Sequence, residues 1–366
     1  MTAKVVGPTA AGVEAAGRVL ASGGLVAFPT ETVYGLGANA LDEAAVRRIF
    51  AVKERPLSDP LIVHVAAPDD AKPLVDLGEG TPAAAAFAAL AEAFWPGPLT
   101  LVCPARPHLP KCLSAGTGTV GVRCPAHPLA RRLIAAAGVP VAAPSANKFG
   151  HVSPTTAQHV LDDLGAEEIS VLDAGPTGGA CAHGIESTVV GVAADGALTL
   201  HRRGAVAREK IEAVAKPLGA KVAVADAYKK DDDDAACAPG QLLTHYAPRL
   251  PAALATVASD AAADDAKSDA YLGACVVVDF HGRLAALEKP ALAYRDLSKT
   301  GDAAEAAAAL FETLRWAEAV PDAKNVFLAD LSEERASAGL VAGVADRIFR
   351  AASGNLIEIP RRGVLG

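Results

Sequence analysis

The 366-residue sequence lacks long hydrophobic runs, and its cysteines are few and scattered. Its most apolar windows, 83–94 and 133–143, fall short of the ~18 apolar residues of a membrane-spanning helix, so we expect no membrane insertion. The six cysteines include no C-x-x-C pair and form no dense framework of the kind found in small secreted domains. The N-terminal residues show no positively charged leader with an apolar core. Together these absences predict a cytoplasmic protein.

An excess of positive charge is also missing. The chain has 34 Lys and Arg residues against 42 Asp and Glu residues, which gives a formal net charge of −8. No chain-wide basic field is available to hold a polyanion, so nucleic-acid binding would need a local basic patch. Hydrophobic residues make up 51% and charged residues 21% of the chain, a balance typical of folded domains. The length leaves room for two of them.

Two common nucleotide-binding signatures are absent or misplaced. No segment matches the G-x-x-x-x-G-K-[ST] pattern of a P-loop. Residues 116–121 match G-x-G-x-x-G, but the following segment is a strand stopped by Pro125, whereas a dinucleotide site needs a helix there. We interpret this segment as a flexible turn that leads into a strand. The cysteines and histidines have no structural-zinc spacing and are interpreted as scattered core residues.

Apolar periodicity predicts alternating helices and strands, and therefore an α/β protein. The expected helices cover 11–20, 43–52, 81–94, 128–137 and 154–164, and the expected strands cover 25–28, 61–65, 99–103, 119–123, 139–143, 169–172, 187–192 and 198–201. After a segment rich in Lys, Asp, Pro and Gly, strand and helix alternate again in 274–280, 302–319, 325–329 and 333–352, whereas 255–269 is expected to be loose. The predicted divisions are a catalytic domain 1–210, a linker 211–250 and a small α/β domain 251–366.

Polar residues gather where the expected strands end, which is where α/β folds bind ligands. The loop after Phe28 carries Thr30 and Thr32 among glycines, although alone it would fit an ordinary turn equally well. Lys53 and Arg55 pair an ammonium with a planar guanidinium, which suits a polyphosphate. The alternative is a solvated helix end.

Further polar groups follow other strands. Arg123 ends one strand, Ser145 and Asn147 follow another, and the pair Ser187 and Thr188 opens a later one. Ser153, placed before Pro154, could equally be a helix N-cap. His64 lies within a strand, where a satisfied, half-buried histidine is the common case. Together with Arg202, these residues predict a cavity that binds nucleotide phosphates through side chains.

Seven segments resemble, in order and spacing, the YrdC-like threonylcarbamoyl-AMP synthases. They are FPTETVYGLG (28–37), KERP (53–56), PLIVH (60–64), FWPGPLT (94–100), VGVRCP (120–125), PSAN (144–147) and ESTV (186–189). PG (239–240), HYAP (245–248), YRDL (294–297) and ADRI (345–348) resemble the linker and C-terminal domain of the long, two-domain form. The resemblance covers nearly the whole chain.

This resemblance implies a fold and a reaction. The implied fold is a twisted mixed sheet with flanking helices, followed by a smaller Rossmann-like α/β domain. The implied enzyme is a nucleotidyltransferase that makes threonylcarbamoyl-AMP and pyrophosphate from L-threonine, bicarbonate or CO2, and ATP, with Mg2+ on the ATP phosphates. The product then serves the N6-threonylcarbamoyladenosine (t6A) modification of tRNA position 37 through a separate transferase complex. Contact with tRNA is expected to be weak or indirect.

The resemblance also implies roles for individual residues. Those expected to act in catalysis are Lys53, Arg55, Ser145 and Asn147. Those expected to bind ATP are Lys53, Arg55, Asp59, Thr119, Ser145, Ser153, Arg202, His245 and Tyr246. Those expected to bind L-threonine are Thr32, His64, Arg123, Ala143 and Ser187, with Arg123 on the carboxylate. No residue is assigned as a metal ligand, because Mg2+ is expected to bind through the ATP phosphates.

Asp59 departs from the family pattern, which usually has an asparagine beside ATP. In the long form the linker folds over the nucleotide, so we expect His245 and Tyr246 to close the site and exclude water. Two alternative functions remain: a carbamoyladenylate-forming maturation enzyme, which would normally carry additional modules, and a non-catalytic RNA-binding module. A steep salt dependence of RNA binding without ATP turnover would identify the latter.

Overall fold

The computed structural model describes four stretches of the chain. They are residues 2–175, 181–225, 242–258 and 271–359. Residues 226–241, which are part of the segment 211–250 expected to be a linker, lie outside them.

The chain divides into two compact units. The first comprises Met1–Phe149 and Ser153–Leu242, and the second comprises Gly150–Val152 and Leu243–Gly366. The short segment 150–152 therefore packs with the second unit, although the residues on both sides of it in sequence belong to the first.

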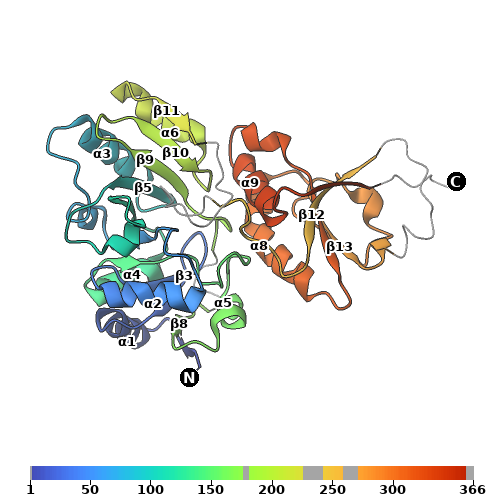
Figure 1. Ribbon diagram of the computed structural model, residues 1–366, viewed down its shortest axis with the longest axis horizontal. Coiled ribbons are helices and arrows are strands. Elements are labelled where there is room, and N and C mark those ends of the chain that lie inside the picture. Colours follow the sequence, from blue (N-terminus) through green and yellow to red (C-terminus); the bar gives the residue numbers. More distant parts are fainter. Residues whose placement is uncertain (1, 176–180, 226–241, 259–270, 360–366) are drawn as a thin grey trace. The chain divides into compact units, whose positions relative to one another are not determined.

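The first unit contains a mixed sheet of eleven described strands (Figure 1). They are β1 (Lys4–Val6), β2 (Val26–Phe28), β3 (Gly35–Asn39), β4 (Ile62–His64), β5 (Leu99–Pro104), β6 (Thr119–Arg123), β7 (Val141–Ala142), β8 (Ser170–Leu172), β9 (Thr188–Val192), β10 (Leu198–Arg202) and β11 (Val222–Val224). Their order is β1-β8-β2-β3-β7-β4-β6-β5-β9-β10-β11. The sheet combines parallel pairs such as β4 with β6 and antiparallel pairs such as β2 with β3.

Helices flank this sheet. They are α1 (Ala10–Ala21), α2 (Glu43–Lys53), α3 (Pro82–Phe94), α4 (Pro128–Ala137), α5 (Ala157–Leu164) and α6 (Arg208–Ala215), with single turns η1 (Pro68–Ala71), η2 (Lys111–Ser114) and η3 (Lys216–Leu218). Asp42 caps α2 by accepting from the backbone N–H groups of Ala44 and Ala45. Helices α1 and α4 touch (Figure 1), and Gly17 makes this possible, because a Cβ there would lie 2.8 Å from the carbonyl carbon of Ala136.

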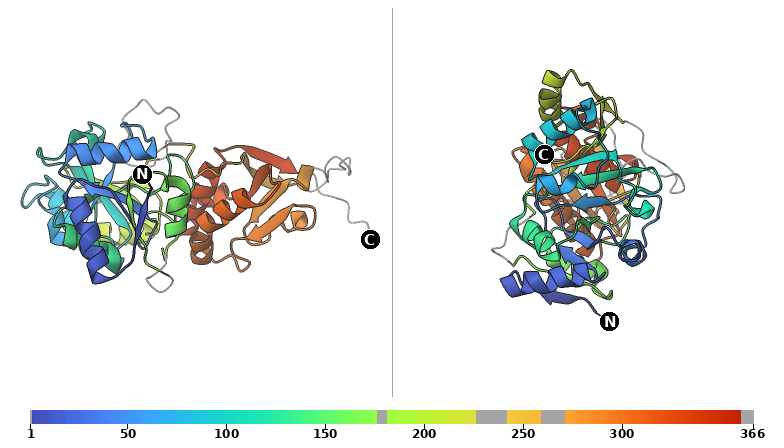
Figure 2. Two further views of the ribbon diagram at one scale, coloured as in Figure 1. Left: turned by 90° about the horizontal axis from the view of Figure 1, so that it is seen from below. Right: turned by 90° about the vertical axis from the view of Figure 1, so that its left-hand side faces the viewer.

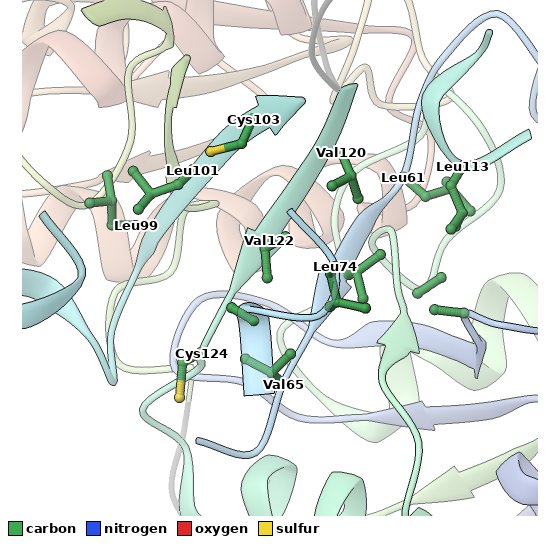
Figure 3. Close-up of a cluster of buried hydrophobic side chains, with 14 of the residues drawn as sticks. Leu61, Val65, Leu74, Leu99, Leu101, Cys103, Leu113, Val120, Val122 and Cys124 are labelled. Carbon is green, nitrogen blue, oxygen red and sulfur yellow. The ribbon is translucent and has the colours of Figure 1, made fainter. Parts of the chain in front are cut away.

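A continuous apolar core lies along the central strands of the first unit. Figure 3 shows side chains of β5 and β6, including Leu101 and Val122, beside Leu74 and Leu113 from outside the sheet. Cys103 and Cys124 lie in the same core and form no disulfide. The core fixes strands β4, β5, β6 and β9, whose ends carry several of the expected site residues.

The second unit contains a parallel sheet of five described strands. They are β12 (Ala252–Val257), β13 (Cys275–Asp279), β14 (Ala293–Asp296), β15 (Asn325–Ala329) and β16 (Leu356–Ile359), in the order β14-β13-β15-β12-β16. The helices are α8 (Ala303–Ala319) and α9 (Val341–Ala351), with turns η4 (Ala285–Leu287) and η5 (Glu333–Ala336). Helices α8 and α9 pack together, α8 against β13 and α9 against β12 (Figure 2).

The structure confirms the expected α/β fold, with a mixed sheet and a parallel one. It also contains elements that were not expected, among them α6, β11, β14 and β16. Three further differences concern segments discussed above. Residues 35–39 form strand β3 and not a loop, and the segment expected to be loose begins within β12. The helix expected from 154 begins at Ala157, and its N-cap is Thr156, whose side chain accepts from the His159 N–H. Ser153 is therefore not a helix cap.

Candidate active site

Arg123 lies at the centre of a buried polar cluster in the first unit. Its Nη1 donates to Thr32 Oγ1 at 3.0 Å, its Nη2 donates to Glu31 Oε1 at 2.6 Å, and its Nε donates to the Gly97 carbonyl at 3.2 Å. Strands β4 and β6 are parallel, and their register places His64 beside Arg123. All these side chains are buried. The structure thus brings together three residues expected to bind threonine: Thr32, His64 and Arg123.

Charges within this cluster set its ionisation states. Burial alone would raise the pKa of Glu31, but the charge and hydrogen bond of Arg123 hold it below its usual value. Burial, together with the positive charge of Arg123, lowers the pKa of His64 to about 3. At neutral pH the cluster therefore contains an ionised carboxylate, a guanidinium and a neutral imidazole.

A second cluster joins Ser187 to Arg202. Arg202 Nη2 donates to the Ser187 carbonyl at 3.0 Å and to its Oγ at 3.1 Å, while Thr100 Oγ1 lies 2.8 Å from the same Oγ. Gly204 packs directly against this segment, since a Cβ there would lie 2.5 Å from backbone atoms of 186–188. Ser187 was expected to bind threonine and Arg202 to bind ATP, and the structure places them in direct contact.

Lys53, the last residue of α2, holds the loop that follows β7. Its Nζ donates to the carbonyl oxygens of Ser145 at 2.7 Å and Asn147 at 2.5 Å. Burial, followed by the charge of Arg55, lowers the pKa of Lys53 well below its usual value. Three residues expected to act in catalysis therefore meet, with the ammonium on backbone oxygens of the other two.

Arg55 and Asp59 form a buried ion pair. Nη2 of Arg55 lies 2.9 Å from Asp59 Oδ2, and the same side chain donates to the carbonyls of Asp59 and Pro60. Both side chains are buried. Asp59, where the family usually has an asparagine, thus neutralises a guanidinium that was expected to meet phosphates.

Ser153 also has a partner that the sequence did not suggest. Its Oγ donates to Glu186 Oε1 at 2.6 Å, and both residues are buried. Thr119 is more peripheral, because its hydroxyl lies 2.9 Å from that of Thr117 at an exposed position. Ala143 contributes backbone only, through an N–H that donates to the Ile62 carbonyl at 2.9 Å.

His245 and Tyr246 belong to the second unit. Tyr246 is fully buried, its ring centroid lies 5.4 Å from that of Phe311, and the Arg350 guanidinium lies 4.8 Å from its centroid. His245 donates its backbone N–H to the Arg350 carbonyl at 3.4 Å. The suggested closing role of the pair over the nucleotide stays a prediction.

Sequence reasoning missed three polar residues of these clusters: Glu31, Thr100 and Glu186. Glu31 stands between Thr30 and Thr32 in the segment already singled out, so a carboxylate directly after a buried strand was a usable signal. Thr100 and Glu186 also lie in segments that carry the resemblance, but their partners are 87 and 33 residues away in sequence, so nothing local indicated their roles.

Among the described residues, no group of three or more His, Cys, Asp and Glu side chains could hold a metal ion. Each buried carboxylate of the site already pairs with an arginine or a hydroxyl. The side chains therefore do not form a magnesium site by themselves. Within the same stretches of chain, no helix has both the length and the hydropathy to cross a bilayer.

Two family models together match most of the chain. The Sua5/YciO/YrdC model, described as "Telomere recombination", matches residues 18–204. A second model, described as "Threonylcarbamoyl-AMP synthase, C-terminal domain", matches residues 206–353. The two matches meet near residue 205.

Curated relatives and a solved structure show the same likeness. A threonylcarbamoyl-AMP synthase of Bacillus subtilis is 45% identical over 65% of this chain and 65% of its own length, and one of Pyrococcus abyssi is 46% identical over 62% of each. The matched part is thus less than two thirds of these relatives. The crystal structure of P. abyssi Sua5 complexed with L-threonine has a TM-score of 0.81 at 34% identity and covers 98% of this chain and 100% of that one. The chain therefore belongs to the Sua5/YciO/YrdC family, in its two-domain form.

Proposed function

We propose that this chain is a nucleotidyltransferase that makes L-threonylcarbamoyl-AMP and pyrophosphate from L-threonine, bicarbonate or CO2, and ATP. The observation that carries the proposal is the buried cluster of Arg123, Thr32, Glu31 and His64, which offers a guanidinium and a hydroxyl inside a protein that belongs to this family. Relatives named threonylcarbamoyl-AMP synthase and the threonine complex of a similar protein support it.

The proposed reaction joins two anions. The threonine ammonium first loses one proton to solvent. The resulting amine bonds to the carbon of CO2 and releases a second proton to solvent, which gives a carbamate. A carbamate oxygen then attacks the α-phosphorus of ATP, the bond from that phosphorus to the β-bridging oxygen breaks, and pyrophosphate leaves. The obstacle is charge repulsion, so catalysis needs cations and donors that hold both reactants in line.

On the threonine side, Arg123 binds the substrate carboxylate, and the neutral His64 and the hydroxyls of Thr32 and Ser187 line the site. Ala143 contributes its backbone. Because His64 stays neutral, it adds no charge beside the incoming amine, which still has to lose a proton.

On the ATP side, Lys53 and Arg55 face the phosphates, and Lys53 at the same time fixes the loop of Ser145 and Asn147. Further proposed contacts to ATP come from Asp59, Thr119, Ser153 and Arg202. Mg2+ would enter on the phosphates, where it neutralises charge, and no step of the proposal passes through a protein-held metal. His245 and Tyr246 are proposed to exclude water from the adenylate.

The proposed product is an activated intermediate for the t6A modification of tRNA, passed in the cytoplasm to a separate transferase complex. Such a division of labour suits a chain whose net charge is −8, since this enzyme would not need to hold tRNA itself.

Pyrophosphate release from ATP tests the proposal. It should require both L-threonine and bicarbonate, and release that continues when either is omitted would refute the assignment. Arg123→Ala should lose at least about 100-fold in kcat/KM for threonine, as expected when a charged hydrogen-bond donor to the substrate is removed. Arg47→Ala, which removes an exposed arginine of α2, is the matched control and should keep the wild-type rate.

A further inference from the structure

The two carboxylate oxygens of Glu31 differ in their hydrogen bonding. The residue is 6% exposed, its Oε1 accepts from Arg123 at 2.6 Å, and its Oε2 has no hydrogen-bond partner among the described residues. Buried polar atoms are almost always hydrogen-bonded, and a charged one without a partner is costly. A partner from outside the described residues is therefore expected at Oε2.

The guanidinium of Arg123, which pairs with Glu31, also has N–H donors without an acceptor among the described residues. An arginine side chain carries five N–H donors. In Arg123, hydrogen bonds to Gly97, Thr32 and Glu31 use one each. Two donors have no acceptor among the described residues, and two is the number that one carboxylate accepts in a bidentate pair.

Two unused donors beside one unused anionic acceptor match a zwitterion. An α-amino acid presents a carboxylate that accepts and, one carbon away, an ammonium that donates. We propose that Glu31 is a further substrate-binding residue, whose Oε2 accepts a hydrogen bond from the α-ammonium of threonine while Arg123 binds the carboxylate. This inference rests on the proposed function and adds to it a reason why the site selects α-amino acids.

The same contact persists through the first chemical step. After the nitrogen has bonded to CO2 it still carries one N–H, which Glu31 accepts in the carbamate. Because Arg123 keeps the carboxylate ionised, Glu31 orients the nitrogen and does not take its proton. The alternative is a purely structural role, in which Glu31 neutralises Arg123 and a buried water donates to Oε2.

Calorimetric titration with two ligands distinguishes these roles. L-threonine carries both charged groups, and (R)-3-hydroxybutyrate is the same molecule without the amine. In Glu31→Gln, the affinity for L-threonine should fall about 10- to 100-fold, the effect of one hydrogen bond to a charged group, while the affinity for (R)-3-hydroxybutyrate should hold or rise. Glu43→Gln, which neutralises an exposed carboxylate of α2, should leave both affinities unchanged.

Three results would count against the inference. An equal loss for both ligands in Glu31→Gln would show that the residue only holds Arg123, and no loss for either would show that Oε2 contacts no substrate. If the variant does not fold, the wild type still decides, since equal affinities of the two ligands would exclude an ammonium acceptor. Failure of the wild type to bind L-threonine at all would instead overturn the proposed function.

Discussion

Protonation of His64 should make the first unit unstable in mild acid. Burial, and then the charge of Arg123, lowers the pKa of His64 from 6.5 to about 3 in the folded protein. Between these two values the unfolded chain binds a proton on this imidazole and the folded protein does not. The free energy of unfolding must therefore fall as the pH falls below about 6.5.

The size of the effect follows from the same two values. At pH 5 the folded protein holds almost no proton on His64, whereas the unfolded chain is nearly fully protonated. The loss of unfolding free energy is then proportional to the 1.5 pH units between the unfolded-state pKa of 6.5 and pH 5. At ~1.4 kcal/mol per unit it amounts to about 2 kcal/mol relative to pH 7.5. His64→Gln should lack this contribution. Burial also lowers the pKa values of His183 and His201, so only the difference between variant and wild type isolates His64.

Trp95 provides a local probe for the measurement. It is buried in the first unit, with its Nε1 donating to the Leu99 carbonyl at 2.7 Å. The other tryptophan, Trp316, lies on α8 of the second unit, so Trp316→Phe leaves fluorescence that reports the first unit alone. Urea unfolding at pH 7.5 and 5.0 then compares wild-type His64 with His64→Gln in this background.

The expected result is that the loss of unfolding free energy between pH 7.5 and 5.0 is about 2 kcal/mol smaller in His64→Gln. A lower limit of pH 5.0 avoids most of the titration of Glu31, because the contribution of a carboxyl with a lowered pKa is lost as the pH falls below its usual value of 4.5. His108→Gln, which removes an exposed imidazole, is the control. Equal losses in His64→Gln and the wild type would refute the reasoning, because His64 would then hold its proton equally in both states.

Three further substitutions test other contacts. Gly204→Ala would place a Cβ against the backbone of 186–188. It should destabilise the first unit by about 1–3 kcal/mol, measured by urea unfolding, and raise the KM for threonine. A variant as stable as the wild type would contradict the close packing. Asp59→Asn should release the charge of Arg55 and lower the KM for ATP about fivefold, and a higher KM would show that the carboxylate helps to bind ATP. Arg315→Ala removes the donor to a buried carbonyl of the second unit and should cost about 1–3 kcal/mol of its stability, whereas an unchanged urea midpoint would mean that another donor replaces it.

Local patterns in the sequence were enough to predict the layers of the fold. Apolar periodicity located α2 and α4 to within a residue, because their buried faces repeat every three to four positions. Strand β3 was not predicted, because its Gly-Leu-Gly-Ala-Asn sequence is typical of a turn. It becomes a strand only through pairing with β2 and β7. The same holds for β12, whose alanines give little strand signal until β15 and β16 pair with it.

The site residues were predictable as types but not as pairs. Position at strand ends and resemblance to a family singled out Arg123 and Thr32, and the structure brings them together across 91 residues of sequence. The partners that set their charge were not visible. Glu31 meets Arg123 across 92 residues, and Asp59 looked like a misplaced carboxylate until its ion pair with Arg55 appeared.

These ion pairs reduce the net positive charge expected at the nucleotide site. The sequence suggested four converging cations at Lys53, Arg55, Arg123 and Arg202, whereas in the structure two of the arginines face a carboxylate each, and burial lowers the pKa of the lysine. Side chains already held by carboxylates and carbonyls keep their positions without substrate, so they lose little conformational freedom when substrate binds. They also attract phosphate less than bare cations would, because part of their charge is cancelled. The site thus has a weaker attraction for anions but a fixed geometry. Substitution of Glu31 should weaken the binding of threonine, and substitution of Asp59 should tighten the binding of ATP.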